Sequence, residues 1–169
     1  MRWARGALLV AVAAAVPVLL LGVRPDEKTA DGRRVEAEKY AEAVRPVLTD
    51  AGRVVVLGIR AALTDYSQGK TNADRLRGEA QAWDTALGGY ADRLRAVEAP
   101  AFLERAKTRY LEALAGYRAV GRRVAEVADA PVAARAAYVT EIAALGNAAD
   151  RVYDEADALV AAATRSGRA

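Results

Sequence analysis

Two side chains that carry out much of protein catalysis are missing from this sequence, because its 169 residues include no histidine and no cysteine. This excludes Ser-His-Asp and Cys-His arrangements, zinc sites with His or Cys ligands, and di-iron bundles that need Glu-x-x-His. Haem ligation is disfavoured as well, since the single methionine is Met1. We therefore predict no catalytic residues, no cofactor and no metal site, and a protein that is not an enzyme.

The segment 64–72, TDYSQGKTN, contains fragments of two catalytic or nucleotide-binding motifs. Its GKT matches the end of a phosphate-binding loop, but that loop requires a glycine where Thr64 stands and a strand before it. Its SQGK matches the nucleophile motif of penicillin-binding enzymes, whose partner motifs are missing here. We interpret the segment as a turn in which Gly69 stops one helix and Thr71 or Asn72 caps the next.

Carboxylates are the remaining side chains that could take part in catalysis or bind a metal ion. Glu36 and Glu38 form one cluster, and Asp154, Glu155 and Asp157 form another. Neither cluster lies in the glycine-bearing loop of a calcium hand. We interpret both as solvent-exposed helix faces, and the alternative is a weak site for a hard cation.

Aromatic residues are few, and five of them could line a pocket between helices: Trp83, Tyr90, Tyr110, Tyr117 and Tyr153. They fall on or next to the apolar positions of the helices predicted below. We therefore interpret them as core residues whose polar ends reach the edge of the fold. A ligand pocket that includes Trp83, Tyr90, Tyr110 and Tyr117 is the alternative.

Apolar residues recur at alternating steps of three and four along much of the chain, which predicts amphipathic helices. The clearest ladder predicts a helix over 73–97 and consists of Leu76, Ala80, Trp83, Leu87, Tyr90, Leu94 and Val97. Helices over 101–128 and 132–164 have similar ladders, the second consisting of Val139, Ile142, Leu145, Ala149, Val152, Ala156 and Leu159. Gly88 and Gly89 lie inside the first ladder, so either another helix approaches closely there or the helix is locally soft.

The same periodicity predicts a helix over 33–66, which contains Pro46. Proline removes a backbone donor and crowds the preceding turn. We therefore expect a kink at Pro46, or a short break near 43–45. The run VVVL at 54–57 is apolar on more than one face, so a strand is an alternative there. Because the helical period continues on both sides, we predict that this run is the deeply buried middle of the helix.

Short connections of about three to six residues separate the four predicted helices, which makes neighbours antiparallel. The predicted fold class is all-α, with an antiparallel up-down-up-down four-helix bundle over 33–164. Alanine-rich helices are marginal alone, so burial of the ladders must supply the stability. The tail 165–169 is expected to fray.

The segment 6–23, GALLVAVAAAVPVLLLGV, contains no charged or strongly polar side chain. A helix of this length rises about 27 Å, close to the roughly 30 Å hydrocarbon core of a bilayer. We predict a membrane-type helix that acts as an uncleaved signal anchor, with a cleaved signal peptide over 1–23 as the alternative. Arg2 and Arg5 precede it, so the positive-inside rule places the rest of the chain outside the cytoplasm. Residues 24–32 are predicted to be a polar linker.

The net charge of +3 does not indicate nucleic-acid binding. Lysine and arginine number 25 and the acidic residues 22, and two of the arginines precede the apolar segment. The doublets Arg33-Arg34 and Arg122-Arg123 have acidic residues nearby, which is typical of solvated helix faces. We therefore expect no nucleic-acid partner, since such partners require a clustered basic face.

Together these features favour a non-enzymatic interaction or structural module of the bacterial cell envelope. It would be anchored in the membrane through 6–23, in a single pass, or secreted if the leader is cleaved. The bacterial source is inferred from the bias to alanine and arginine, which GC-rich genomes favour. The alternative is an extracytoplasmic domain that binds a small ligand, since a four-helix bundle behind an N-terminal membrane helix resembles bacterial sensor domains in architecture. We expect it to act through a partner, an envelope protein of unknown identity.

Overall fold

The computed structural model describes residues 27–165, and these form helices without any strand. The first helical rod joins three consecutive segments: α1 (Glu27–Arg53), the π-helical η1 (Val54–Arg60) and α2 (Ala61–Ser67). The other long helices are α3 (Ala73–Ala96), α4 (Glu104–Asp129) and α5 (Arg135–Arg165). Single turns of 3-10 helix precede α4 and α5, η2 (Ala101–Leu103) and η3 (Val132–Ala134).

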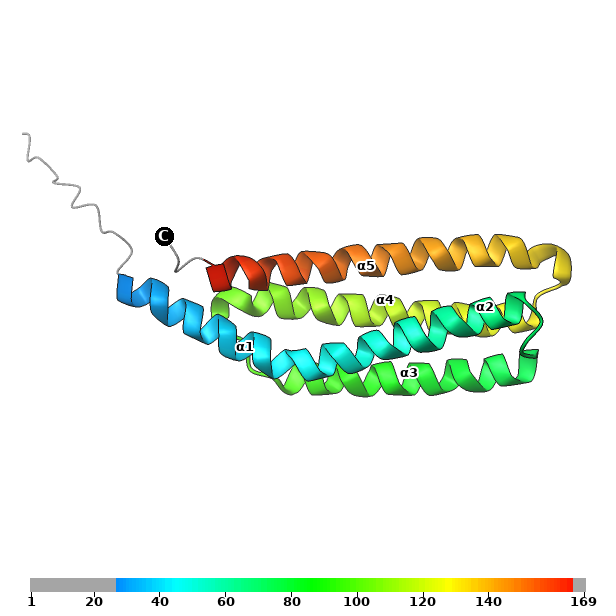
Figure 1. The fold of residues 1–169 in the computed structure, drawn as a ribbon, viewed down its shortest axis with the longest axis horizontal. Helices are drawn as coiled ribbons and strands as arrows, with labels where there is room; N and C mark the ends of the chain where they lie inside the picture. The colour runs from blue at the N-terminus through cyan, green and yellow to red at the C-terminus, as the bar shows by residue number, and fades with distance from the viewer. Residues whose placement is uncertain (1–26, 166–169) are drawn as a thin grey trace, which may run out of the picture.

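The helices pack side by side in one bundle (Figure 1). The first rod and α4 run in one direction, and α3 and α5 run in the other. The first rod packs against α3 and α5, and α4 also packs against both of these helices. The predicted all-α fold of four packed, antiparallel helices is therefore confirmed for the described residues.

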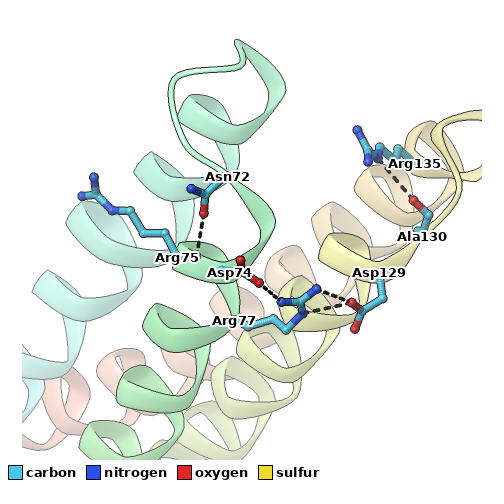
Figure 2. Close-up of polar contacts among 7 residues, drawn as sticks. All are labelled: Asn72, Asp74, Arg75, Arg77, Asp129, Ala130 and Arg135. Carbon is cyan, nitrogen blue, oxygen red and sulfur yellow. Dashed lines mark hydrogen bonds and ion pairs between the residues drawn. The ribbon is translucent and has the colours of Figure 1, made fainter.

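The turn before α3 is built as its residue types predict. Gly69 has a φ of +69°, in the left-handed region where glycine carries no steric cost. Asn72 caps α3, because its side-chain oxygen accepts a hydrogen bond of 2.9 Å from the backbone N–H of Arg75 (Figure 2). The interpretation of 64–72 as a helix-ending turn is confirmed.

One arginine ties the start of α3 to the end of α4 (Figure 2). The Arg77 guanidinium donates to Asp129 at 2.9 and 2.8 Å and also pairs with Asp74. Nearby, Arg135 donates to the backbone carbonyl of Ala130 at the connection into α5. These contacts are exposed, so they fix how the connections lie and add little stability.

The predicted ladder of α3 forms the core at five of its seven positions, Leu76, Ala80, Trp83, Leu87 and Leu94. The other two, Tyr90 and Val97, are only partly buried. The ladder of α5 is confirmed only in part. Its members Ile142, Ala149 and Ala156 are buried, whereas Val139 and Leu145 are 45% and 36% exposed. The prediction was wrong for these two residues, because each lies three positions from the buried Ile142, at an edge of the buried face of α5.

A close helix approach occurs, but not at the glycine pair of α3. At Gly88 the nearest group is the guanidinium of Arg118 at ordinary contact distance, and nothing lies near Gly89. The tight points are Gly116 of α4, where an added Cβ would lie 2.9 Å from the Cβ of Ala149 on α5, and Gly58 of η1, where it would lie 2.8 Å from Nε1 of Trp83 on α3. Glycine is required there because any side chain would collide with the neighbouring helix.

The first rod departs from prediction in three ways. It begins at Glu27, inside the range 24–32 that was predicted to be a linker. It continues through Pro46 without the expected break near 43–45, although Figure 1 shows α1 and α2 at an angle to each other, with η1 between them. Proline and π-helical turns both bend helices, so the bend has two sources.

The third departure concerns the run 54–57, which is not deeply buried. Val55 is buried, but Val56 and Leu57 are 53% and 72% exposed. The helical prediction was correct and the burial was not, because four consecutive residues of a helix cannot all face the core. The buried face there is that of Val55 and Ile59, and Val56 and Leu57 point away from it.

Residues 1–26 and 166–169 lie outside the described structure. The predicted membrane helix at 6–23 and the end of the predicted tail at 165–169 fall there. Within 27–165, no helix is both long enough and apolar enough to traverse a bilayer.

Candidate ligand groove between the first rod and α5

A groove follows the junction between the first rod and α5. It consists of three adjoining hollows of about 830, 450 and 350 Å³. The first and second hollows share Leu48, Gly52 and Tyr153. The second and third share Val55, Arg60, Tyr117 and Asp150. We call this feature the α1–α5 groove.

Small residues on both walls explain why the two helices do not close over the groove. Gly52 of α1 and Ala161 and Gly146 of α5 all line it, and none carries a side chain long enough to interlock with the opposite helix. Tyr110 and Tyr117 contribute to the lining from α4. The groove thus has polar aromatic groups beneath it and short side chains along its rims.

A three-residue polar contact crosses the middle of the groove. The Tyr117 hydroxyl donates to Asp150 Oδ1 at 2.7 Å, and the Arg60 guanidinium donates to Asp150 Oδ2 at 2.7 Å. These residues come from α4, α5 and η1, so one carboxylate joins three elements. Burial, and then the hydrogen bond to Asp150, raises the pKa of Tyr117 well above its usual value. The hydroxyl therefore keeps its proton and acts as a donor.

A second tyrosine–aspartate pair lies in the first hollow. The Tyr110 hydroxyl donates to Asp157 Oδ1 at 2.5 Å. The rings of Tyr110 and Tyr153 meet edge to face, with centroids 5.4 Å apart and an interplanar angle of 62°, which is a favoured aromatic geometry. Burial raises the pKa of both tyrosines, and the carboxylate of Asp157 raises each further.

The groove carries an excess of negative charge. Five carboxylates line it, and only two guanidinium groups do. The carboxylates are those of Glu38, Glu42, Asp150, Asp154 and Asp157. The guanidinium groups are those of Arg45 and Arg60. The lining therefore has a formal net charge of −3, which favours cationic over anionic occupants.

The four aromatic residues predicted as pocket or core do not converge on one site. Tyr110 and Tyr117 are 2% and 9% exposed and line the groove, so they are core and pocket at once. Trp83 is buried from α3, with its indole against Gly58 of η1. Tyr90 is half-buried on α3 with the guanidinium of Arg93 5.6 Å from its ring centre. Neither Trp83 nor Tyr90 lines the groove.

Sequence reasoning missed Arg60 and Asp150. It placed Asp157 on an exposed helix face, which is confirmed, but did not foresee that this carboxylate accepts a hydrogen bond from Tyr110. A signal for the α5 residues was present, because Asp150, Tyr153 and Asp157 are spaced by three and four. That spacing places them on one helix face, next to apolar ladder positions. No comparable signal marks Arg60, since its position depends on the π-helical turn.

The groove residues are suited to binding and not to acid–base catalysis. The pKa shifts of its tyrosines lead away from neutral pH, whereas a general acid or base works best with a pKa near the ambient pH. Within the described residues, no group of three or more acidic side chains is placed to hold a metal ion. What the groove offers is hydrogen bonding, aromatic faces and negative charge.

Comparisons with known proteins give no relative for this chain: no protein-family model matches it, and neither the curated proteins nor the solved structures yield a significant match.

Proposed function

We propose that this protein is a non-enzymatic ligand-binding bundle of the bacterial cell envelope, which takes up a small molecule in the α1–α5 groove and acts through a partner protein. The observation that carries the proposal is the groove itself. Its largest hollow, of about 830 Å³, lies within the range of roughly 300–1,000 Å³ that is usual for small-molecule sites. Hydrogen-bonding groups from α4 and α5 reach into it, which is how such sites orient a ligand.

The proposed location depends on the sequence alone. The apolar segment 6–23, preceded by Arg2 and Arg5, supports a single-pass anchor with the bundle outside the cytoplasm, or secretion after cleavage. Fractionation of an epitope-tagged protein, followed by mass measurement, tests this. Retention of residues 1–23 in the membrane fraction is expected for an anchor. A full-length protein in the soluble cytoplasmic fraction contradicts the proposed location.

The second candidate is an interaction or structural module that docks a partner protein. Val56 and Leu57 favour it, because these adjacent apolar side chains are 53% and 72% exposed on η1. Single exposed apolar residues are common on protein surfaces, but an exposed pair on an irregular helical turn is a natural contact point. Val56 also lines the second hollow of the groove, whereas Leu57 lies outside the groove lining, and neither side chain offers a hydrogen-bonding group to a small molecule.

A matched pair of glycine variants tests the ligand-binding proposal. Gly52 and Gly89 are both exposed helical glycines with open space around the Cβ position, but only Gly52 lines the groove. The full-length protein is incubated with small-molecule extracts of the cell envelope, re-isolated and analysed by mass spectrometry. We expect a molecule that wild type and Gly89→Leu retain and Gly52→Leu loses.

Retention of no small molecule by wild type contradicts ligand binding. Capture of an envelope protein that is lost in Leu57→Ser, without any small molecule bound, supports the docking module instead.

A further inference from the structure

We propose that the occupant of the α1–α5 groove is an organic cation, an amine with an apolar or aromatic body, and that it binds in the hollow between α1 and the C-terminal half of α5. This inference rests on the proposed function, and it adds the chemical class of the ligand. Three observations carry it: the unpaired carboxylates, the aromatic faces and the size of the hollow.

The first observation is which charges remain unpaired. Arg60 is held by Asp150, and Glu38 is held by Arg34 at 2.9 Å. Within the described part of the chain, Glu42, Asp154 and Asp157 have no ion-pair partner, and among the groove cations only Arg45 has none. The excess negative charge is therefore still available to a ligand.

The unpaired carboxylates come from both walls. Glu42 belongs to α1 and Asp157 to α5, and both line the first hollow. Among the described residues, the hydrogen-bond donor to Asp157 is the neutral Tyr110 hydroxyl, which brings no positive charge. An ammonium group between the walls would bring the positive charge that these carboxylates lack. Hydrogen bonds between an ammonium and a carboxylate are roughly twice as strong as hydrogen bonds between neutral groups.

The second observation is the aromatic pair. Tyr153 is half-buried, and it lines the first and second hollows beside Tyr110. The negatively polarised face of an aromatic ring attracts a cation within about 6 Å of its centre, and an ammonium with an organic body gains apolar contact as well. Because its pKa is raised, the Tyr153 hydroxyl stays protonated and the ring stays neutral at physiological pH.

The third observation is size and spacing. The acidic side chains of the groove do not form a compact metal cluster within the described residues, and a hollow of about 830 Å³ is far larger than a bare ion. An organic cation fits both facts, because its charge can reach one carboxylate while its body fills the apolar lining around Val44, Leu48 and Val160.

Three probes that share one ring test the charge requirement. Phenylethylammonium, 2-phenylethanol and phenylacetate are titrated calorimetrically into the full-length chain in a non-ionic detergent at neutral pH. We expect the ammonium to bind at least about tenfold more tightly than the alcohol, a difference of roughly 1.4 kcal/mol, and the carboxylate not to bind. Amide chemical shifts should move in α1 and the second half of α5, and higher salt should weaken binding.

Charge-removing variants then locate the ammonium. Asp157→Asn and Glu42→Gln should each weaken phenylethylammonium binding about three- to tenfold, as expected for a partly exposed charge contact. Asp92→Asn is the control, because Asp92 is an exposed carboxylate of α3 outside the groove lining, and its ion pair with Arg95 is solvent-exposed as well. Glu42 makes no ion pair or hydrogen bond with the described residues, so Glu42→Gln keeps the test valid even if Asp157→Asn disturbs Tyr110.

Equal affinity for the ammonium and the alcohol, preference for phenylacetate, or no binding of any probe would each overturn the cation inference. Unchanged affinity in both groove variants would do the same. These outcomes are distinct from a failure of the proposed function, which is decided by the extract experiment. A neutral or anionic molecule recovered there from the Gly52-dependent site would preserve ligand binding and refute the cation.

Discussion

The two sides of α5 differ in how tightly helices meet. On its α4 side, Gly116 allows the helices to approach until an added Cβ would collide with Ala149. On its other side, α5 faces the first rod across a groove that contains Tyr117 and Asp150. A regular apolar ladder thus produces a closed interface, whereas a rod interrupted by Pro46 and a π-helical segment produces an open one.

This difference divides the bundle into a structural part and a part available for binding. The fully buried leucines Leu87, Leu94 and Leu114 belong to α3 and α4. The polar contacts that involve Arg60, Asp150 and the groove tyrosines lie where the first rod is packed less closely. Binding sites require unsatisfied and accessible groups, which a closed interface does not supply.

The largest expected effects come from truncation of buried leucines. Leu94→Ala removes a completely buried side chain of α3 and should lower the free energy of unfolding by about 2–5 kcal/mol. Leu48→Ala removes a side chain that is 7% exposed on the groove wall, where water can enter and little closed cavity forms, and should cost about 1.5–3 kcal/mol. Urea denaturation of the two variants measures both. Equal losses would erase the proposed difference between the sides.

Alkaline and acid pH should each lower the free energy of unfolding, through a residue of the first rod and a residue between α3 and α4, respectively. Burial, and then the charge of Glu104, raises the pKa of Tyr40 on α1 to about 12. Since the folded state holds this proton more tightly, ionising Tyr40 costs the folded protein about 2–3 kcal/mol, so stability is unaffected below pH 10 and falls as pH rises through 12. Hydrogen bonding to Arg118 lowers the pKa of Asp84, which joins α3 to α4.

The contribution of Asp84 has the opposite pH dependence: it is present above the carboxyl's ordinary pKa and lost as pH falls through the lowered value. Stability should therefore fall at alkaline pH in a manner that Tyr40→Phe reduces, and at acid pH in a manner that Asp84→Asn reduces. Denaturation midpoints across pH test this. The same alkaline loss in wild type and Tyr40→Phe would contradict it.

Two glycine substitutions should act in opposite directions. Gly116→Ala forces the α4–α5 interface apart and should destabilise the fold by about 1–3 kcal/mol. Gly89→Ala meets nothing within 4 Å and should stabilise α3 by up to about 1 kcal/mol through helix propensity. Thermal melts monitored by circular dichroism measure both shifts. A tolerated Gly116→Ala would show that this contact is not close-packed.

The smallest changes in stability are expected when a tyrosine hydroxyl is removed, and they should differ between a hydroxyl that makes a hydrogen bond and one that does not. Tyr117→Phe removes a hydrogen bond to Asp150 and should cost about 1 kcal/mol. The buried hydroxyl of Tyr40 has no hydrogen-bond partner, so Tyr40→Phe should be neutral or stabilising by up to about 1 kcal/mol at neutral pH. Chemical denaturation resolves the difference. The reverse order of the two effects would contradict the hydrogen-bond assignment.

The sequence was enough to predict the helical fold but not the contacts in the groove, because periodicity predicts which helix face is buried and not which polar groups meet. Periodic apolar residues determine which face of a regular helix is buried, so the α3 ladder with Leu76 and Leu87 was predicted correctly. The expectation failed at Val56 and Leu57, because four consecutive residues of a helix cannot all face the core, and the buried face is that of Val55 and Ile59. Tyr110 and Tyr117 were recognised as core or pocket residues. Their partners Asp157 and Asp150 were not, because an apolar ladder does not say which carboxylate a hydroxyl meets.

Native-state hydrogen exchange of the full-length protein tests most directly whether the first rod is the loosely held element. Amides of α1 and η1 should exchange through openings of lower free energy than amides in the middle of α4, which should exchange only on global unfolding. If the amides of η1 and of α4 instead exchange with the same opening free energy, the bundle is one cooperative unit. The division between a closed side and an open, ligand-accessible side would then be contradicted.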